Sequence, residues 1–109
     1  MNIHMGIDIN DGMDFSPLEL VRVRTLTGHR GIVYTVAISS DGKTIVSGSA
    51  DANAKVWDYA SGGLKHTLSG HRGRVYTVAI SPDNKTIVSG SADNTIKIWD
   101  LNTGEFLRT

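Results

Sequence analysis

The chain has 109 residues, a formal net charge of zero, 39% hydrophobic residues, 12 glycines and no cysteine. The balanced charge, without a basic run of five or more residues, argues against a nucleic-acid backbone or an anionic membrane surface as a partner. The lack of cysteine excludes disulfides and thiolate chemistry, and no stretch reaches the roughly 18 apolar residues of a membrane span. Because no secretory signal is visible either, we expect a cytoplasmic protein.

Residues 1–20 form an acidic leader that we expect to be flexible or loosely docked. Part of the leader resembles the twelve-residue calcium-binding loop, whose positions 1, 3, 7 and 12 would be Asp8, Asn10, Asp14 and Glu19. The sixth position of such a loop requires a glycine for its sharp turn, and here it is Met13. We therefore expect no metal site in the leader.

Residues 21–109 are predicted to form short β-strands separated by turns. Val21–Thr27 is the first, and Val33–Ile38, which alternates β-branched and aromatic residues, predicts a core strand with both faces covered. Turn residues such as Asp41-Gly42 then lead into further strands. These strands are Thr44–Ser49, Ala54–Tyr59, Leu64–Ser69, Thr86–Ser91, Thr95–Leu101 and Glu105–Thr109.

Residues 24–65 and 66–107 are two copies of one unit. Aligned without a gap, 27 of the 42 positions are identical. A period of this length is typical of proteins in which each unit buries its apolar faces against neighbouring units. Two copies leave two outer faces without a neighbour, so we expect the chain to associate with itself rather than remain a stable monomer.

Both copies carry the same spaced motifs. Gly28-His29 and Gly70-His71 open them, Trp57-Asp58 and Trp99-Asp100 lie near their ends, and Ser47–Asp51 and Ser89–Asp93 lie between. This pattern resembles the WD-repeat family of β-propellers. The resemblance implies an all-β fold with two four-stranded antiparallel propeller blades per chain, expected to close into a β-propeller by homo-oligomerisation.

The resemblance also implies a structural hydrogen-bond network in each copy. Its residues are His29, Ser47, Asp51 and Trp57 in the first copy, and His71, Ser89, Asp93 and Trp99 in the second. A fully paired buried network specifies one arrangement of its blade. The alternative is a hydrolase that uses the Ser/His/Asp set, but the sequence shows no oxyanion site, so we expect no catalytic residue. No two histidines have the spacing of metal ligands, and no cofactor is expected.

In the resembling family, partners bind the loop face that surrounds the central channel. That face maps onto Arg30, Ile32, Tyr34, Ala50, Arg72, Arg74, Tyr76 and Ala92. Tyrosine and arginine are enriched in binding hot spots, so the expected function is a non-enzymatic scaffold that presents this face to a protein or peptide. For Tyr34 and Tyr76, packing at the channel mouth is an equally good interpretation.

Ring closure by identical two-blade chains requires an even number of blades. Propellers typically hold about four to eight blades, and the family mostly has seven. The angle that each blade occupies in the ring therefore changes less in a ring of eight blades than in a ring of six. We therefore favour a tetramer over a trimer, with either Val21–Thr27 or Glu105–Thr109 completing the second blade. The remaining alternative is that the sequence is a fragment or an engineered piece of a longer propeller.

Overall fold

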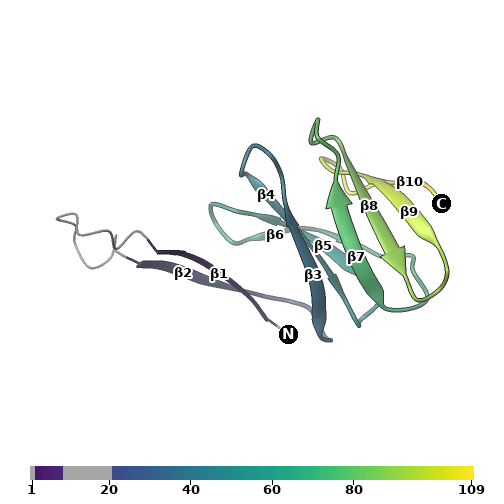
Figure 1. The fold of residues 1–109 in the computed structure, drawn as a ribbon, viewed down its shortest axis with the longest axis horizontal. Helices are drawn as coiled ribbons and strands as arrows, with labels where there is room; N and C mark the ends of the chain where they lie inside the picture. The colour runs from purple at the N-terminus through teal and green to yellow at the C-terminus, as the bar shows by residue number, and fades with distance from the viewer. Residues whose placement is uncertain (1, 9–20) are drawn as a thin grey trace.

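The computed structural model of the chain describes residues 2–8 and 21–109, which form ten β-strands (Figure 1). Residues 9–20 lie outside the described part, so the expectations for the leader, including the calcium-loop pattern at Asn10, Asp14 and Glu19, remain predictions. The strands belong to one two-stranded and two four-stranded antiparallel sheets.

The first four-stranded sheet, here called the first blade, follows chain order. Its strands are β3 (Val33–Ile38), β4 (Thr44–Ser49), β5 (Ala54–Asp58) and β6 (Leu64–Leu68). The turn between β3 and β4 forms as its residues predict, because Gly42 has a φ of 72° and Asp41 accepts a hydrogen bond from the backbone N–H of Lys43.

The second blade repeats this order. Its strands are β7 (Val75–Ile80), β8 (Thr86–Ser91), β9 (Ile96–Asp100) and β10 (Phe106–Arg108). β10 pairs with β9, so the segment Glu105–Thr109 completes its own blade, which settles the choice of outer strand in the described chain. The prediction of an all-β chain with two four-stranded antiparallel blades is confirmed.

β2 (Val21–Thr27) forms as predicted and pairs along its whole length with β1 (Asn2–Asp8), for which the sequence analysis had assigned no strand. Figure 1 shows this two-stranded sheet extending away from the two blades. The end of β2 nevertheless contacts the first blade, since Leu26 is buried against Ile45 and Trp57. The chain then enters the first blade through Gly28 and His29.

The two blades pack face to face along a surface that we call the seam, with β3 and β7 side by side (Figure 1). From the first blade, Val46, Val56 and Leu68 are fully buried there. The second blade contributes side chains from β7, β8 and β9. These are Val75, Val78, Ile87 and Trp99. The core of the described chain is thus a contact between units, as its repeat period predicts.

One expectation about β3 is wrong. Both of its faces were expected to be covered, but Tyr34, Val36 and Ile38 are 39%, 46% and 48% exposed. Val36 and Ile38 lie opposite Ser47 and Ile45 in the register and therefore share the face that points away from the seam. Their counterparts in the second blade, Val78 and Ile80, are covered by the first blade, whereas no described blade lies before the first.

On the open face of the second blade, an exposed residue has a counterpart in the first blade that is buried at the seam. Ile96 is 62% exposed, whereas its counterpart Ala54 is buried at the seam. We call the face of the first blade with Val36 and Ile38 the front face. The rear face is that of the second blade with Ala79, Val88, Ile96 and Ile98, whose register places them together.

Candidate functional site

The predicted hydrogen-bond network is present in the first blade. Trp57 Nε1 donates to Ser47 Oγ at 2.9 Å, and Ser47 Oγ lies 2.6 Å from His29 Nε2. His29 Nδ1 lies 2.8 Å from Asp51 Oδ2. With a proton on His29 Nδ1, each donor along the chain from tryptophan to aspartate has one acceptor.

The second blade repeats this network. Trp99 Nε1 donates to Ser89 Oγ at 2.9 Å, Ser89 Oγ lies 2.7 Å from His71 Nε2, and His71 Nδ1 lies 3.0 Å from Asp93 Oδ2. Across the described residues, no buried side-chain nitrogen or oxygen lacks a hydrogen-bond partner. The two networks therefore satisfy the buried histidines, serines and tryptophans that compose them.

Local backbone geometry fixes the aspartates at the end of each network. Asp51 Oδ2 also accepts from the backbone N–H of Arg30, and its Oδ1 accepts from that of Asn53. The carboxylate thereby ties the Gly-His loop to the turn after β4. In the second blade, Asp93 makes the same two backbone contacts, with Arg72 and Thr95.

The charges follow from these contacts. Burial lowers the pKa of His29, although Asp51 opposes the effect, so the neutral imidazole is favoured. For Asp51, burial alone would raise the pKa. The hydrogen bonds donated by His29 and by the backbone of Arg30 and Asn53 have the larger combined effect, so the pKa of Asp51 is lowered. For Asp93, the hydrogen bond from the Thr95 side chain is the largest cause of a strongly lowered pKa.

The geometry does not provide a nucleophile. Ser47 and Ser89 have no exposed surface, and each hydroxyl is held between a tryptophan and a histidine. A hydrolase needs a serine that a substrate can reach. The arrangement instead connects a loop, two strands and a turn of one blade through hydrogen bonds.

The predicted loop-face residues lie together at the end of the blades where β3 and β7 begin. The backbone N–H of Ala50 donates to Ile32 O at 2.8 Å, and that of Ala92 donates to Arg74 O at 2.9 Å, so each turn lies beside its Gly-His loop. Arg30, Arg72 and Arg74 are exposed, and Ile32 is 52% exposed. Ala50 is half-buried.

The structure also brings the two tyrosines of this face together. The rings of Tyr34 and Tyr76 lie 5.1 Å apart with an interplanar angle of 56°. Tyr76 lies close enough to the Arg74 side chain to raise the pKa of Arg74. Both rings remain partly exposed, so they close the seam at this end and still present an aromatic surface.

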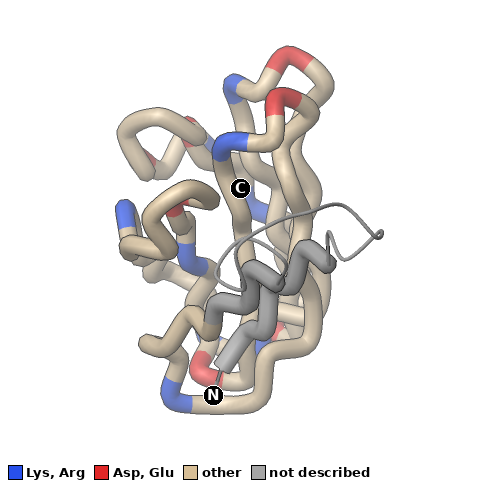
Figure 2. Tube along the Cα trace, turned by 90° about the vertical axis from the view of Figure 1, so that its left-hand side faces the viewer, with Lys and Arg blue, Asp and Glu red and all other residues tan. Residues whose placement is uncertain are grey.

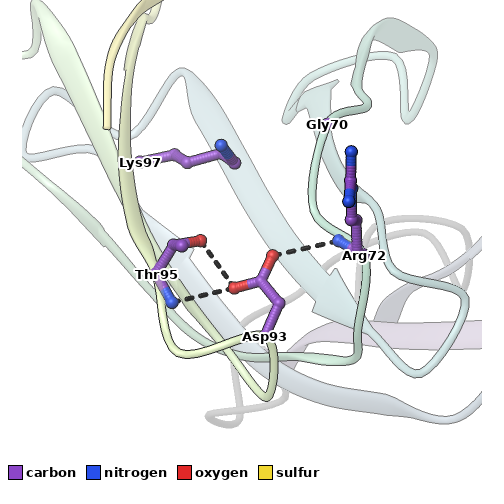
Figure 3. A pocket seen from close by; sticks show the side chains of 5 residues that line it. All are labelled: Gly70, Arg72, Asp93, Thr95 and Lys97. Carbon is purple, nitrogen blue, oxygen red and sulfur yellow. Dashed lines mark hydrogen bonds between the residues drawn. The ribbon is translucent and has the colours of Figure 1, made fainter.

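A cavity of about 440 Å³ opens beside the network of the second blade. Figure 3 shows Arg72 on one side and Lys97 and Thr95 on the other, with Asp93 between the two sides and Gly70 at the margin. Asp93 is already paired within the protein, and Lys97 Nζ donates to Thr109 Oγ1 at 3.1 Å. Sequence reasoning missed Thr95 and Lys97 here, although the repeat of Lys55 as Lys97 was a signal that could have been used.

The β3–β4 and β7–β8 turns each carry an aspartate and a lysine. Figure 2 shows blue and red positions next to one another at the tips of the two hairpins drawn at the top, so neither tip carries one sign alone. Among the described residues, no group of three or more His, Asp or Glu side chains is placed to hold a metal ion. The described part of the chain also has no helix long and apolar enough to cross a membrane.

Two antiparallel meanders, each fastened by the same internal network and packed face to face, define a repeat protein of the β-propeller class. The family described as "WD domain, G-beta repeat" matches residues 20–58 and 62–100, which is more than half of the chain. The chain therefore belongs to the WD-repeat family, as its motifs predicted.

Several characterised proteins are similar to this chain. Vegetative incompatibility protein HET-E-1 of Podospora anserina is 52% identical over 39 residues, which cover 36% of this chain and 3% of that protein. Pre-mRNA-splicing factor PRP46 of Yarrowia lipolytica is 40% identical over 52 residues, covering 48% of this chain and 11% of that protein. Small ribosomal subunit protein RACK1y of Oryza sativa subsp. japonica is 48% identical over 42 residues, which cover 38% of this chain and 12% of that protein. The chain thus spans a small part of each relative's length.

Proposed function

We propose that the chain is a non-enzymatic protein-interaction module that binds a protein or peptide through its loop face, and that it acts in the cytoplasm. The observation that carries this proposal is the pair of exposed tyrosines at one end of the seam, with Arg74 close to Tyr76 and Ile32 on the same face. Aromatic rings and arginine provide large contact areas with directed hydrogen bonds, as in binding hot spots. Two relatives are named as a pre-mRNA-splicing factor and a small ribosomal subunit protein, and these names support the same class.

A peptide selection would test the loop face. Peptides selected from a random library on the purified chain would be titrated against Ile32→Ala and Arg74→Ala. Lys43→Ala and Lys85→Ala are matched controls, because these exposed lysines lie on the hairpins at the other end of the blades. We expect the loop-face variants to weaken binding at least about tenfold, the loss of about 1.4 kcal/mol, and the controls to leave it unchanged. Weakening by the controls alone would overturn the assignment.

We further propose that the chain assembles head to tail with copies of itself. The seam is the template: Val46 and Val56 pack there against Val78 and Ile87. The rear face presents the counterparts Val88 and Ile98, and the front face presents Val36 and Ile38. The two open faces thus repeat most of the apolar residues of the two faces that already fit each other, with Ile96 on the rear face in place of Ala54. A ring of four chains with eight blades remains the favoured closure, ahead of a trimer with six.

Complementation between blocked chains tests this assembly. Val36→Lys places a charge on the front face and Val88→Lys places one on the rear face, so each variant alone should be monomeric. A mixture should form a one-to-one dimer and nothing larger, because only one front face and one rear face remain intact. Ser69→Lys, at an exposed loop position, should assemble like the unmodified chain. Native mass spectrometry that found no dimer in the mixture would overturn the proposal.

A further inference from the structure

The two copies of the repeat differ in the turn that reaches across the seam. The first blade has Ser40 and Gly42 in its β3–β4 turn, and the second blade has Pro82 and Asn84 at the equivalent positions. We propose that this difference makes two unequal contacts: a seam within the chain that is clamped by hydrogen bonds, and a front-to-rear contact with a second copy that is apolar and unclamped. This inference rests on the proposed head-to-tail assembly and identifies where that assembly opens.

The clamp within the chain consists of hydrogen bonds between Ser40 and Asn84. The backbone N–H of Ser40 donates to Asn84 Oδ1 at 3.1 Å, and the Asn84 amide donates to Ser40 Oγ at 2.9 Å. Ser40 Oγ also lies 3.2 Å from Asn84 Oδ1 and 3.4 Å from Pro82 O. These contacts join the two hairpin tips at the end of the seam opposite the tyrosine pair.

The same geometry cannot be repeated between copies. When the rear face of one chain meets the front face of the next, Pro82 stands where Ser40 stands within the chain, and Gly42 stands where Asn84 stands. Proline has neither a backbone N–H nor a hydroxyl group, and glycine has no amide side chain. All of the side-chain donors and acceptors of the clamp are therefore missing from that contact.

Most of the apolar part of the contact is kept, although Ile96 replaces Ala54, which is buried at the seam. Val88, Ile98 and Ala79 repeat Val46, Val56 and Ala37, and the tyrosine pair can be repeated because both tyrosines recur. The close approach of the two blades is kept as well. Gly48 leaves room for Val75 at the seam, since a Cβ added to Gly48 would lie 2.7 Å from Val75 Cγ1. The counterpart of Gly48 on the rear face is also a glycine, Gly90. The second copy thus binds through burial, without the polar bonds that fix the position of the hairpin tips.

The clamp can be added to the contact between copies with residues that the chain already uses. Pro82→Ser is placed in the Val36→Lys chain, and Gly42→Asn in the Val88→Lys chain, so the new pair can meet only across the front-to-rear contact. Gly42 accepts the change, because its φ of 72° resembles the 60° of Asn84 and an added Cβ meets no atom within 4 Å. The dissociation constant of the dimer is measured for all four combinations by analytical ultracentrifugation.

We expect the combination of both substitutions to lower the dissociation constant about tenfold, and each substitution alone to change it less than about threefold. The coupling between them is the signature of a hydrogen-bonded pair. A dimer that forms in the reference mixture but shows no coupling would overturn the unequal contacts and leave the assembly standing. Absence of any dimer in the reference mixture would overturn both.

The reverse exchange gives an independent readout. Asn84→Gly removes the clamp inside the chain, so it should lower the urea midpoint of unfolding while the dissociation constant between copies stays within about twofold. A tenfold weaker contact between copies, with an unchanged urea midpoint, would show that Asn84 acts between chains and would contradict the assignment.

Discussion

Replacing Ser47 with alanine is the most direct test of the network. Its hydroxyl accepts from Trp57 Nε1 and lies 2.6 Å from His29 Nε2, and Ser47 and Trp57 are 0% and 1% exposed. Alanine would leave both partners buried without a hydrogen bond. A buried polar group left unpaired costs about 1–3 kcal/mol, so the expected loss of unfolding free energy for the two partners is about 2–6 kcal/mol.

Urea unfolding at one fixed protein concentration would measure this loss, since assembly adds a concentration-dependent term. Ser69→Ala, an exposed serine, is the control and should change stability by less than about 0.5 kcal/mol. In a Trp57→Phe background the indole donor is absent, and Ser47→Ala should then cost less by about 1 kcal/mol or more. A loss below about 0.5 kcal/mol in the unmodified background would refute the reasoning that the network stabilises the blade.

Three further predictions use other features. Ala52 has a φ of 71°, which disfavours residues with a Cβ, so Ala52→Gly should raise the unfolding free energy by about 0.5–1 kcal/mol while Ala92→Gly should not; equal effects would contradict this. Gly48→Ala would place its Cβ 3.1 Å from Val75 O at the seam and should lower stability by about 1–3 kcal/mol, and an unchanged urea midpoint would show that the blades adjust. Because the pKa of His29 is lower in the folded chain than its ordinary value of about 6.5, the unfolded chain binds the extra proton first, so this contribution to stability is full above pH ~6.5 and is lost as the pH falls through the folded-state value. Melting temperatures should therefore fall between pH 7 and 5, and a flat profile would count against a buried neutral imidazole.

The strands and the networks could be predicted because their signals are local or repeated. Alternation along Val33–Ile38 and turn residues such as Gly42 fix strands and hairpins through neighbouring residues alone. The network residues are far apart in sequence, but their recurrence at one spacing and the family resemblance identified them as a set. The structure confirmed the element types, with differences of only one or two residues at the strand ends.

What could not be predicted depends on how the blades face each other. Alternation shows that the side chain of Val36 is apolar, but it cannot show whether a neighbouring sheet covers it. The same limit applies to the equivalent positions Ala54 and Ile96, because only the packing of the blades decides that Ala54 is buried while Ile96 is exposed. The Ser40–Asn84 clamp was also missed, because the two residues do not occupy equivalent positions and no repeat pattern pairs them.

The outer strand of the first blade has a consequence for how such a chain can lengthen. β6 covers Leu64–Leu68, whereas the boundary between the two sequence copies falls between residues 65 and 66. Suppose that a new 42-residue unit is inserted at that boundary by recombination. The new unit would then supply most of the outer strand of the blade before it. Growth by whole units would never leave a bare sheet edge inside the chain, so duplication and loss of repeats would disturb only the number of blades and not their hydrogen bonding.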